Sequence, residues 1–290
     1  MSLTGHERRQ KVRTSAPGPA AADGRADRGR RRVGWLPSRR TTLPIASVVV
    51  FLVVWQVLGS RINPILLATP SAVASSFADI VRTGTLVYAF LRALEVLAVG
   101  FGIAAVVGIA VGLAMGRNET IGRILDPYVS FFQATPLIAL TPLVVIWTGI
   151  GFTAEVTITF LLAVWSVIIN TAEGTRNTPA ILLDMARVYH ATERSVVRNV
   201  AMPHALPYIF AGLRIALAKA LIGVIIGEMD VSLKGLGGLI VNYGDAFQTA
   251  PLLASIVSSS LVGVIGTIIL EVLRRRLAPW STSGHVHTQV

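Results

Sequence analysis

Long apolar segments alternate with shorter polar ones along most of this chain. Six apolar segments come close to the length of about 20 residues that a helix needs to cross a bilayer. They lie at about 44–60, 88–115, 128–149, 152–171, 205–227 and 251–273. An even number of spans leaves both ends of the chain on one side of the membrane. The pattern predicts an all-α fold, a polytopic six-helix transmembrane bundle over residues 44–280.

Prolines interrupt two regions of this pattern. The stretch 61–87 contains two prolines and predicts a short amphipathic surface helix instead of a seventh span. The third span contains Pro136 and Pro142 and predicts a kinked helix. Carbonyl groups freed at such a kink need polar partners or a wet cavity, so this span could either line a path or simply bend.

The second span carries a stripe of small residues, Gly108, Gly112 and Gly116, at intervals of four. Such stripes let helix backbones approach closely in lipid. Two interpretations stay open for this stripe: helix packing within the chain, or a seam between two copies of it.

The composition agrees with a membrane protein. Hydrophobic residues make up 53% of the chain and charged residues only 14%, with a mean hydropathy of +0.65, whereas soluble domains average about 25% charged residues. The chain has no cysteine, which excludes disulfides, thiolate zinc sites and a cysteine nucleophile. We find no hydrolytic motif or metal-ligand spacing in it, so we expect a transport protein and not an enzyme.

The net charge of +11 comes mainly from one end of the chain. Residues 1–43 hold eleven basic and three acidic residues, a surplus of eight, among Pro, Gly and Ala. This composition predicts a disordered basic tail held in the cytoplasm, with no nucleic-acid partner. Arg274, Arg275 and Arg276 follow the last span, which places the C-terminus and its tail 281–290 in the cytoplasm as well.

A polar segment, 178–208, separates the fourth and fifth spans. It predicts two short helices, the first capped by Thr178 and the second by Thr192. Each helix carries an apolar stripe with charged residues on either side, which indicates a docking surface. The stripes consist of Ile181, Met185 and Val188, and of Val196, Val197 and Val200.

This segment resembles the cytoplasmic coupling loop of ABC importer permeases, whose pattern is E-A-A, three residues, Gly, nine residues, then I-x-L-P. Asp184-Met185-Ala186 stands at E-A-A, His190 at the glycine, and Val200 to Pro203 at I-x-L-P. Asp184 is one methylene shorter than the usual Glu. His190 replaces a glycine that permits a left-handed backbone or a close approach, which affects the turn between the two helices.

The resemblance extends from about Leu67 to Trp280. Its further pieces are Thr69-Pro70-Ser71, the glycine-rich second span, Leu125-Asp126-Pro127, the stretch 133–147, Asn170-Thr171, Gly212-Leu213-Arg214, Gly227-Glu228-Met229 and Gly235-Leu236-Gly237. Together they are most similar to the permeases for nitrate, taurine, aliphatic sulfonates and, in close relatives, pyrimidine vitamin precursors. The resemblance implies a type I importer in the bacterial cytoplasmic membrane and a substrate that is a small anion, such as an alkanesulfonate, taurine or nitrate. A pyrimidine vitamin precursor is the alternative substrate.

The implied importer draws its energy from another subunit. A P-loop needs Gly-Lys-Ser/Thr, and the lysines of this chain are followed by Val, Ala and Gly. The resemblance therefore implies that two ATPase subunits hold the ATP and Mg²⁺, while this chain carries no cofactor. It also implies a homodimer of this permease in the lipid bilayer and an extracytoplasmic substrate-binding protein, which would dock on 61–87 and 228–250. A role in ATPase docking follows for Ile181, Asp184, Met185, Ala186, His190, Val200 and Pro203.

Four residues in or beside the spans are candidates for the translocation path or its gate: Glu95, Gln133, Lys219 and Glu228. Glu95, Lys219 and Glu228 are ionisable, and such groups are costly in lipid unless they are paired or hydrated, so each of these three indicates a function. Gln133 lies in the third span, which the prolines predict to be kinked. Structural alternatives stay open: an Arg92/Glu95 ion pair, pairing of Lys219 with a buried Glu or its snorkelling to the membrane surface, and an interfacial charge at Glu228.

Two other functions stay open on the sequence. One is a secondary transporter or channel without an ATPase, which would show inverted repeats and paired intramembrane charges. The other is a membrane anchor or assembly factor that transports nothing.

Overall fold

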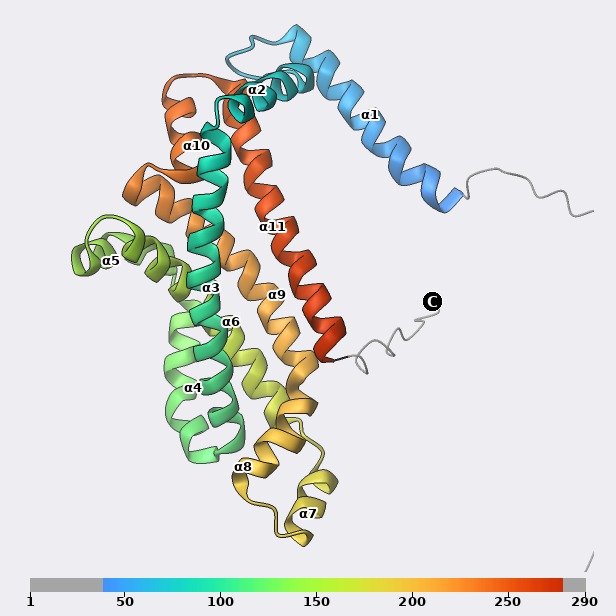
Figure 1. Cartoon of the computed structure of the whole chain (residues 1–290), viewed down its shortest axis with the longest axis vertical. Helices are drawn as coiled ribbons and strands as arrows, with labels where there is room; N and C mark the ends of the chain where they lie inside the picture. Colours follow the sequence, from blue (N-terminus) through green and yellow to red (C-terminus); the bar gives the residue numbers. More distant parts are fainter. Residues whose placement is uncertain (1–38, 279–290) are drawn as a thin grey trace, which may run out of the picture. The chain divides into compact units, whose positions relative to one another are not determined.

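The computed structural model describes residues 39–278, and the described part of the chain is all-α (Figure 1). Its helices are α1 Arg39–Arg61, α2 Pro70–Arg82, α3 Thr85–Arg117, α4 Glu119–Ala134, α5 Thr141–Thr148, α6 Phe152–Arg176, α7 Ala180–Val188, α8 Glu193–Val196, α9 Met202–Gly227, α10 Gly235–Asp245 and α11 Thr249–Leu277. Within the described range, residues 48–278 form one compact unit. Residues 1–38 of the predicted tail 1–43 lie outside the described residues. The whole predicted tail 281–290 lies outside them as well.

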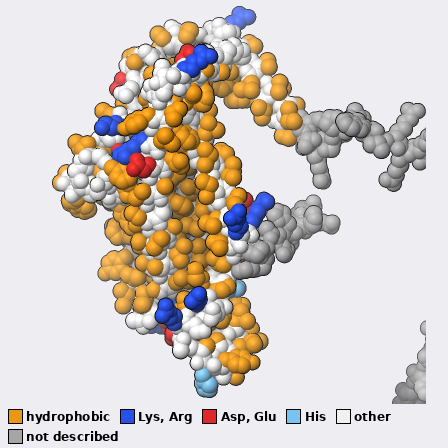
Figure 2. Space-filling view, in the orientation of Figure 1, with side chains coloured by type: hydrophobic (Ala, Val, Ile, Leu, Met, Phe, Trp, Pro, Cys, Tyr) orange, Lys and Arg blue, Asp and Glu red, His pale blue; other side chains and the backbone are white. Residues whose placement is uncertain are grey.

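Five helical segments are long and apolar enough to cross a membrane, and a sixth span exists if α4 and α5 are counted together. The five are Leu43–Arg61, Thr85–Arg117, Phe152–Arg176, Glu193–Ser232 and Thr249–Leu277. Hydrophobic side chains cover much of α3, α9 and α11 in Figure 2. The prediction of an all-α membrane bundle is confirmed.

The third predicted span is not a single kinked helix. α4 starts at Glu119, earlier than predicted, because the side chain of Asn118 accepts hydrogen bonds from two backbone N–H groups of its first turn. It ends before Pro136, where Thr135 adopts an extended backbone, as a residue before proline usually does. α4 and the segment Leu137–Thr148 then meet at 90°. The break is too sharp for a proline kink, so this region is a broken span or a re-entrant segment.

The core forms where α3, α6 and α9 pack together. At the contact of α3 with α6, a Cβ on Gly108 would lie 2.6 Å from Cβ of Val167, and one on Gly112 would lie 2.6 Å from Cβ of Thr171. A Cβ on Gly116 would overlap Thr175. The glycine stripe therefore packs within the chain, and α6 covers the face that a seam between copies would need.

The surface helix predicted in 61–87 is confirmed as α2. The hydroxyl of Thr69 accepts a hydrogen bond from the N–H of Ala72 and caps the helix, and Pro70 occupies its first turn. Val73 and Ile80 point into the core and are buried. α2 thus packs its apolar face against the bundle and leaves its opposite face exposed.

Candidate functional site

α7 exposes an apolar stripe in the polar segment between α6 and α9. Ile181 is 70% exposed, Met185 52% and Val188 75%. On another face of α7, Ala186 is buried. Beside the stripe, Nη1 of Arg187 donates a hydrogen bond of 2.8 Å to Oδ1 of Asp184. α7 thus presents apolar groups and an ion pair to the outside, at the lower end of the bundle in Figure 1.

The start of α7 differs from the prediction, while the start of α8 agrees with it. The hydroxyl of Thr178 donates to the backbone oxygen of Thr175, 2.8 Å away, so Thr178 completes the end of α6 and does not cap α7. The residue that precedes α7 is Pro179, which has no side-chain cap to offer. For α8 the predicted cap is confirmed, because the N–H of Ser195 donates to Oγ1 of Thr192 at 3.4 Å.

His190 stands in a left-handed turn that ends α7. Its φ is 49°, a conformation in which glycine is the usual residue. The N–H of His190 donates to the oxygen of Arg187 and the N–H of Ala191 to that of Ala186, both at 2.9 Å. These two bonds define a Schellman motif. The turn between the two helices therefore keeps the glycine-like geometry despite the histidine.

The other docking candidates lie closer to the bundle. Val200 and Pro203 are half-buried, at the junction between α8 and α9. A π-helical turn, Val197–Ala201, precedes Pro203 and widens the helix by one residue. Such a turn gives the proline ring room, since the ring would clash with a carbonyl group of a regular α-helix. Ala186, Val200 and Pro203 therefore position the segment, while Ile181, Asp184, Met185 and His190 are exposed.

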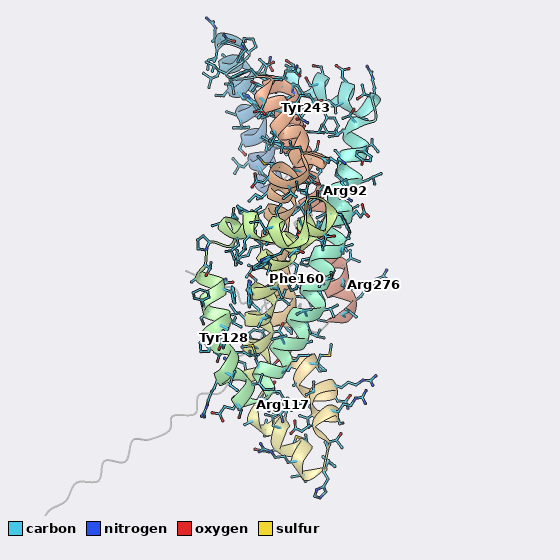
Figure 3. All side chains as sticks on the ribbon, turned by 90° about the vertical axis from the view of Figure 1, so that its left-hand side faces the viewer. Arg92, Arg117, Tyr128, Phe160, Tyr243 and Arg276 are labelled. Atoms are coloured by element: carbon cyan, nitrogen blue, oxygen red, sulfur yellow. The ribbon has the colours of Figure 1, made fainter. Side chains whose placement is uncertain are left out.

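An ion pair fixes α8 to the end of α3. Nη2 of Arg117, the last residue of α3, lies 3.2 Å from a carboxylate oxygen of Glu193. Figure 3 shows Arg117 at this lower end of the molecule. A movement of the α7–α8 segment would therefore act on α3 as well as on α6 and α9.

Two path candidates, Gln133 and Lys219, lie in contact. Nζ of Lys219 on α9 donates to Oε1 of Gln133 on α4, 3.3 Å away. Lys219 forms no ion pair with any residue of the range 39–278, so the structure does not support the alternative in which it pairs with a buried Glu. The structure brings together a cation and an amide just before the break between α4 and α5.

Glu95 belongs to a charge cluster centred on Arg92. Nη1 of Arg92 is 3.2 Å from Oε2 of Glu95, and its Nη2 is 3.2 Å from Oε2 of Glu155 on α6. The Arg92 guanidinium also lies over the ring of Phe152, 4.6 Å from its centroid. The predicted Arg92/Glu95 pair is confirmed, and Arg92, labelled in Figure 3, joins α3 to α6.

Sequence reasoning missed Glu155. Its side chain is fully buried, and its Oε1 has no hydrogen-bond partner in the described part of the protein. The signal was available, because Glu155 lies inside the predicted span 152–171, where any carboxylate indicates a function. Glu155 is therefore a further candidate for the gate.

Glu228 is a buried residue and not an interfacial charge. Its side chain is fully buried, and its Oε2 accepts a hydrogen bond of 2.8 Å from the N–H of Gly237 on α10. A Cβ on Gly235 would overlap the Glu228 carboxylate, so this glycine makes room for it. The neighbouring Gly227 lies against Glu155, since a Cβ there would be 3.2 Å from Cα of Glu155. Glu228 thus connects α9 to α10 beside the Arg92 cluster.

Residues 104–279 match the sequence model of the family described as the binding-protein-dependent transport system inner membrane component. The chain belongs to this family. Up to residue 278, where the described part of the chain ends, the matched region comprises the second half of α3 and every helix from α4 to α11. It therefore contains the α7–α8 segment.

Relatives of the permease cover most of its length. The taurine transport system permease protein of Escherichia coli is 30% identical over 253 residues, which are 85% of this chain and 92% of that protein. The bicarbonate transport system permease protein of Synechococcus elongatus is 31% identical over 241 residues, 78% and 84% of the two chains. Further relatives, 28–30% identical, are named as permeases for nitrate, formylaminopyrimidine and riboflavin.

A solved structure confirms the fold. A chain of the MetNI methionine ABC transporter, in an inward-facing conformation, has a TM-score of 0.56 and 21% identity, and the match covers 66% of the permease and 97% of that chain. The permease is therefore a multi-pass inner membrane subunit of an ABC importer, a transport component and not an enzyme. Its family implies an ATPase and a binding protein as partners, which removes the secondary transporter, the channel and the membrane anchor as alternatives.

Proposed function

We propose that α7 docks into the separate ATPase subunit, and that two copies of this permease with two ATPase subunits form the importer. The observation that supports this proposal most strongly is the exposed stripe of Ile181, Met185 and Val188. Helix faces of this kind insert into hydrophobic grooves of partner proteins, with anchors spaced at i, i+4 and i+7. The ion pair of Asp184 with Arg187 lies on the rim of this surface and suits a partner with charges of both signs.

Docking is tested by co-purification of the ATPase subunit with the permease in detergent. We expect Ile181→Glu/Met185→Glu to abolish co-purification and ATP-driven uptake, because two buried carboxylates without partners would each cost several kcal/mol at the interface. The two positions are exposed in the permease by itself, so the variant should fold. Ala186 is unsuitable for this test because a substitution of this buried residue would disturb α7 itself.

The matched control is Ile65→Glu/Leu66→Glu, which adds the same charges to two exposed apolar residues near α2. We expect it to retain the ATPase. Retention of the ATPase by the α7 variant, or equal loss from both variants, would contradict docking through α7.

We further propose that Gln133 and Lys219 line the substrate path, and that the substrate is a small anion such as an alkanesulfonate, taurine, nitrate or bicarbonate. The relatives named for taurine, bicarbonate and nitrate support an anion. Lys219 supplies a cation whose described hydrogen-bond partner is a neutral amide, so its charge is free to attract an anion. A pyrimidine vitamin precursor is the alternative that the relative named for formylaminopyrimidine supports.

Replacement of Lys219 by alanine should lower uptake of the anion by about 10- to 100-fold, the effect of losing a hydrogen bond to a charged group. Binding of the ATPase subunit should stay unchanged, because Lys219 is far in sequence from the α7–α8 segment and contacts Gln133. Uptake by reconstituted vesicles measures the first effect and co-purification the second. Lys219→Arg, which keeps the charge, is expected to retain most of the uptake. Loss of assembly in Lys219→Ala would show a structural role instead.

We also propose an orientation of the chain from its charges. Arg274 and Arg275 lie in the last turn of α11, and by the positive-inside rule we expect this end, both termini and the α7–α8 segment to face the cytoplasm. The binding protein then docks on 61–87 and 228–250 from outside. In this arrangement Glu95, Glu155 and Glu228 act at the outer gate, where α3, α6, α9 and α10 meet.

A further inference from the structure

A groove of about 850 Å³ lies between the end of α3, the start of α4 and the segment from α8 to the start of α9. None of the functions assigned above uses it. One half of its lining is apolar and includes Ala110, Leu113, Ile121 and Met202. The other half is polar and includes Arg117, Arg194 and Arg198. The groove is therefore amphipathic along its length.

The polar half of the groove contains cationic side chains that no acidic residue neutralises. Its two acidic residues already have partners, since Glu119 pairs with Arg123 and Glu193 with Arg117. Arg194 and Arg198, one helical turn apart, form no ion pair with any residue of the described range. In addition, Nε of Arg117 is buried without a hydrogen-bond partner among those residues. The groove thus offers several N–H donors to an anion.

The groove lies at one end of two candidate spans. The candidate span of α3 ends at Arg117, and another candidate span, which contributes α8 and the start of α9 to the groove, begins at Glu193. The apolar lining residues Ala110 and Leu113 lie inside the first of these spans. Along α3 the apolar lining thus lies closer to the middle of the candidate span than Arg117 does, which is the order in which acyl chain and headgroup follow one another in a bilayer.

We infer that this groove binds an anionic phospholipid, with the phosphate on Arg117, Arg194 and Arg198 and an acyl chain along the apolar half. Basic pockets beside transmembrane helices are suited to anionic headgroups. A soluble phosphate would satisfy the arginines and leave the apolar half in water, which is why a lipid fits the lining better. A lipid held here contacts α3, α4 and α8 together, next to the Arg117–Glu193 ion pair.

Native mass spectrometry of the purified permease, titrated with dioleoyl phosphatidylglycerol or dioleoyl phosphatidylcholine, tests this site. We expect the anionic lipid to bind at least about tenfold more tightly than the zwitterionic one. Arg194→Gln/Arg198→Gln should weaken phosphatidylglycerol binding about 25-fold, because each arginine beside an anionic headgroup contributes about fivefold. Arg117 is left in place to preserve its ion pair with Glu193.

Two further variants distinguish lipid binding in the groove from a general electrostatic attraction of the lipid to the protein surface. Arg61→Gln/Arg276→Gln removes the same charge from exposed positions outside the groove, and binding should change less than about twofold. Ala110→Phe fills the apolar half without a change of charge, and it should weaken phosphatidylglycerol binding while leaving the arginines intact. Equal effects of the two arginine pairs, no effect of either groove variant, or full competition by inorganic phosphate would each overturn the lipid site. Full competition by inorganic phosphate would identify a soluble anion as the occupant.

Discussion

Arg92→Leu is expected to lower the free energy of unfolding of the permease by about 3–5 kcal/mol, because it leaves the carboxylate of Glu155 buried without its ion-pair partner. The Glu155 side chain is fully buried, and its Oε2 lies 3.2 Å from Nη2 of Arg92. Its Oε1 already lacks a partner among the described residues, so no other group there can replace the arginine. The contact of Arg92 with Phe152 is lost as well. Unfolding in mixed micelles, followed by tryptophan fluorescence, measures the change.

A second substitution distinguishes this cause from a general loss of packing. Arg92→Leu/Glu155→Gln removes both charges, and we expect it to recover most of the lost stability, since a buried pair can be replaced by neutral groups at little cost. Glu95→Gln is the matched control, because Glu95 contacts the same arginine while its side chain is 57% exposed. Its effect should stay below about 1 kcal/mol. An Arg92→Leu variant as stable as Glu95→Gln would show that Glu155 is not held in a closed environment.

Gly112→Leu should destabilise the permease by about 3 kcal/mol, at the upper end for overpacked cores. A Cβ at this position would lie 2.6 Å from Cβ of Thr171 and 2.7 Å from the backbone oxygen of Ile168. A backbone oxygen of α6 cannot turn aside as a flexible side chain can, so α3 and α6 would have to separate. Gly108 and Gly116 belong to the same close contact. A small shift of one helix therefore cannot relieve the overlap that a leucine at position 112 would cause.

Gly102→Leu in the same helix is the control for this variant. Nothing lies within 4 Å of a Cβ at Gly102. Because leucine has a higher helix propensity than glycine, we expect this variant to be as stable as the wild type or more stable by up to about 1 kcal/mol. Comparable losses for Gly102→Leu and Gly112→Leu would mean that the close contact of α3 with α6 does not limit stability.

Several features of the fold could be predicted from the sequence because they depend on neighbouring residues. The length and apolar character of the spans follow from local composition, and five of the six predicted spans coincide with membrane-length helices. The helix α2 and its Thr69 cap follow from a short motif and an amphipathic period. The exposed stripe of Ile181, Met185 and Val188 follows from helical spacing in a polar segment.

Local signals were insufficient where a residue had two possible partners. Thr178 stands where a cap of α7 is expected, but its hydroxyl donates to the backbone oxygen of Thr175 near the end of α6 instead. The two prolines in 133–147 predict a bend, but the sequence does not give its size, and the structure shows a break of 90°. The role of His190 at a glycine position was decided by two backbone hydrogen bonds that hold its left-handed turn.

That this protein is an all-α membrane permease with a polar segment at 178–208 could be read from the sequence, because hydropathy and motifs of adjacent residues carry those properties. Which charges are paired and which faces are covered became known from the packing of the helices. Arg92 meets Glu155 across 63 residues and Lys219 meets Gln133 across 86 residues. Contacts at such separations depend on how helices pack, and the chemistry of either residue alone is compatible with many partners.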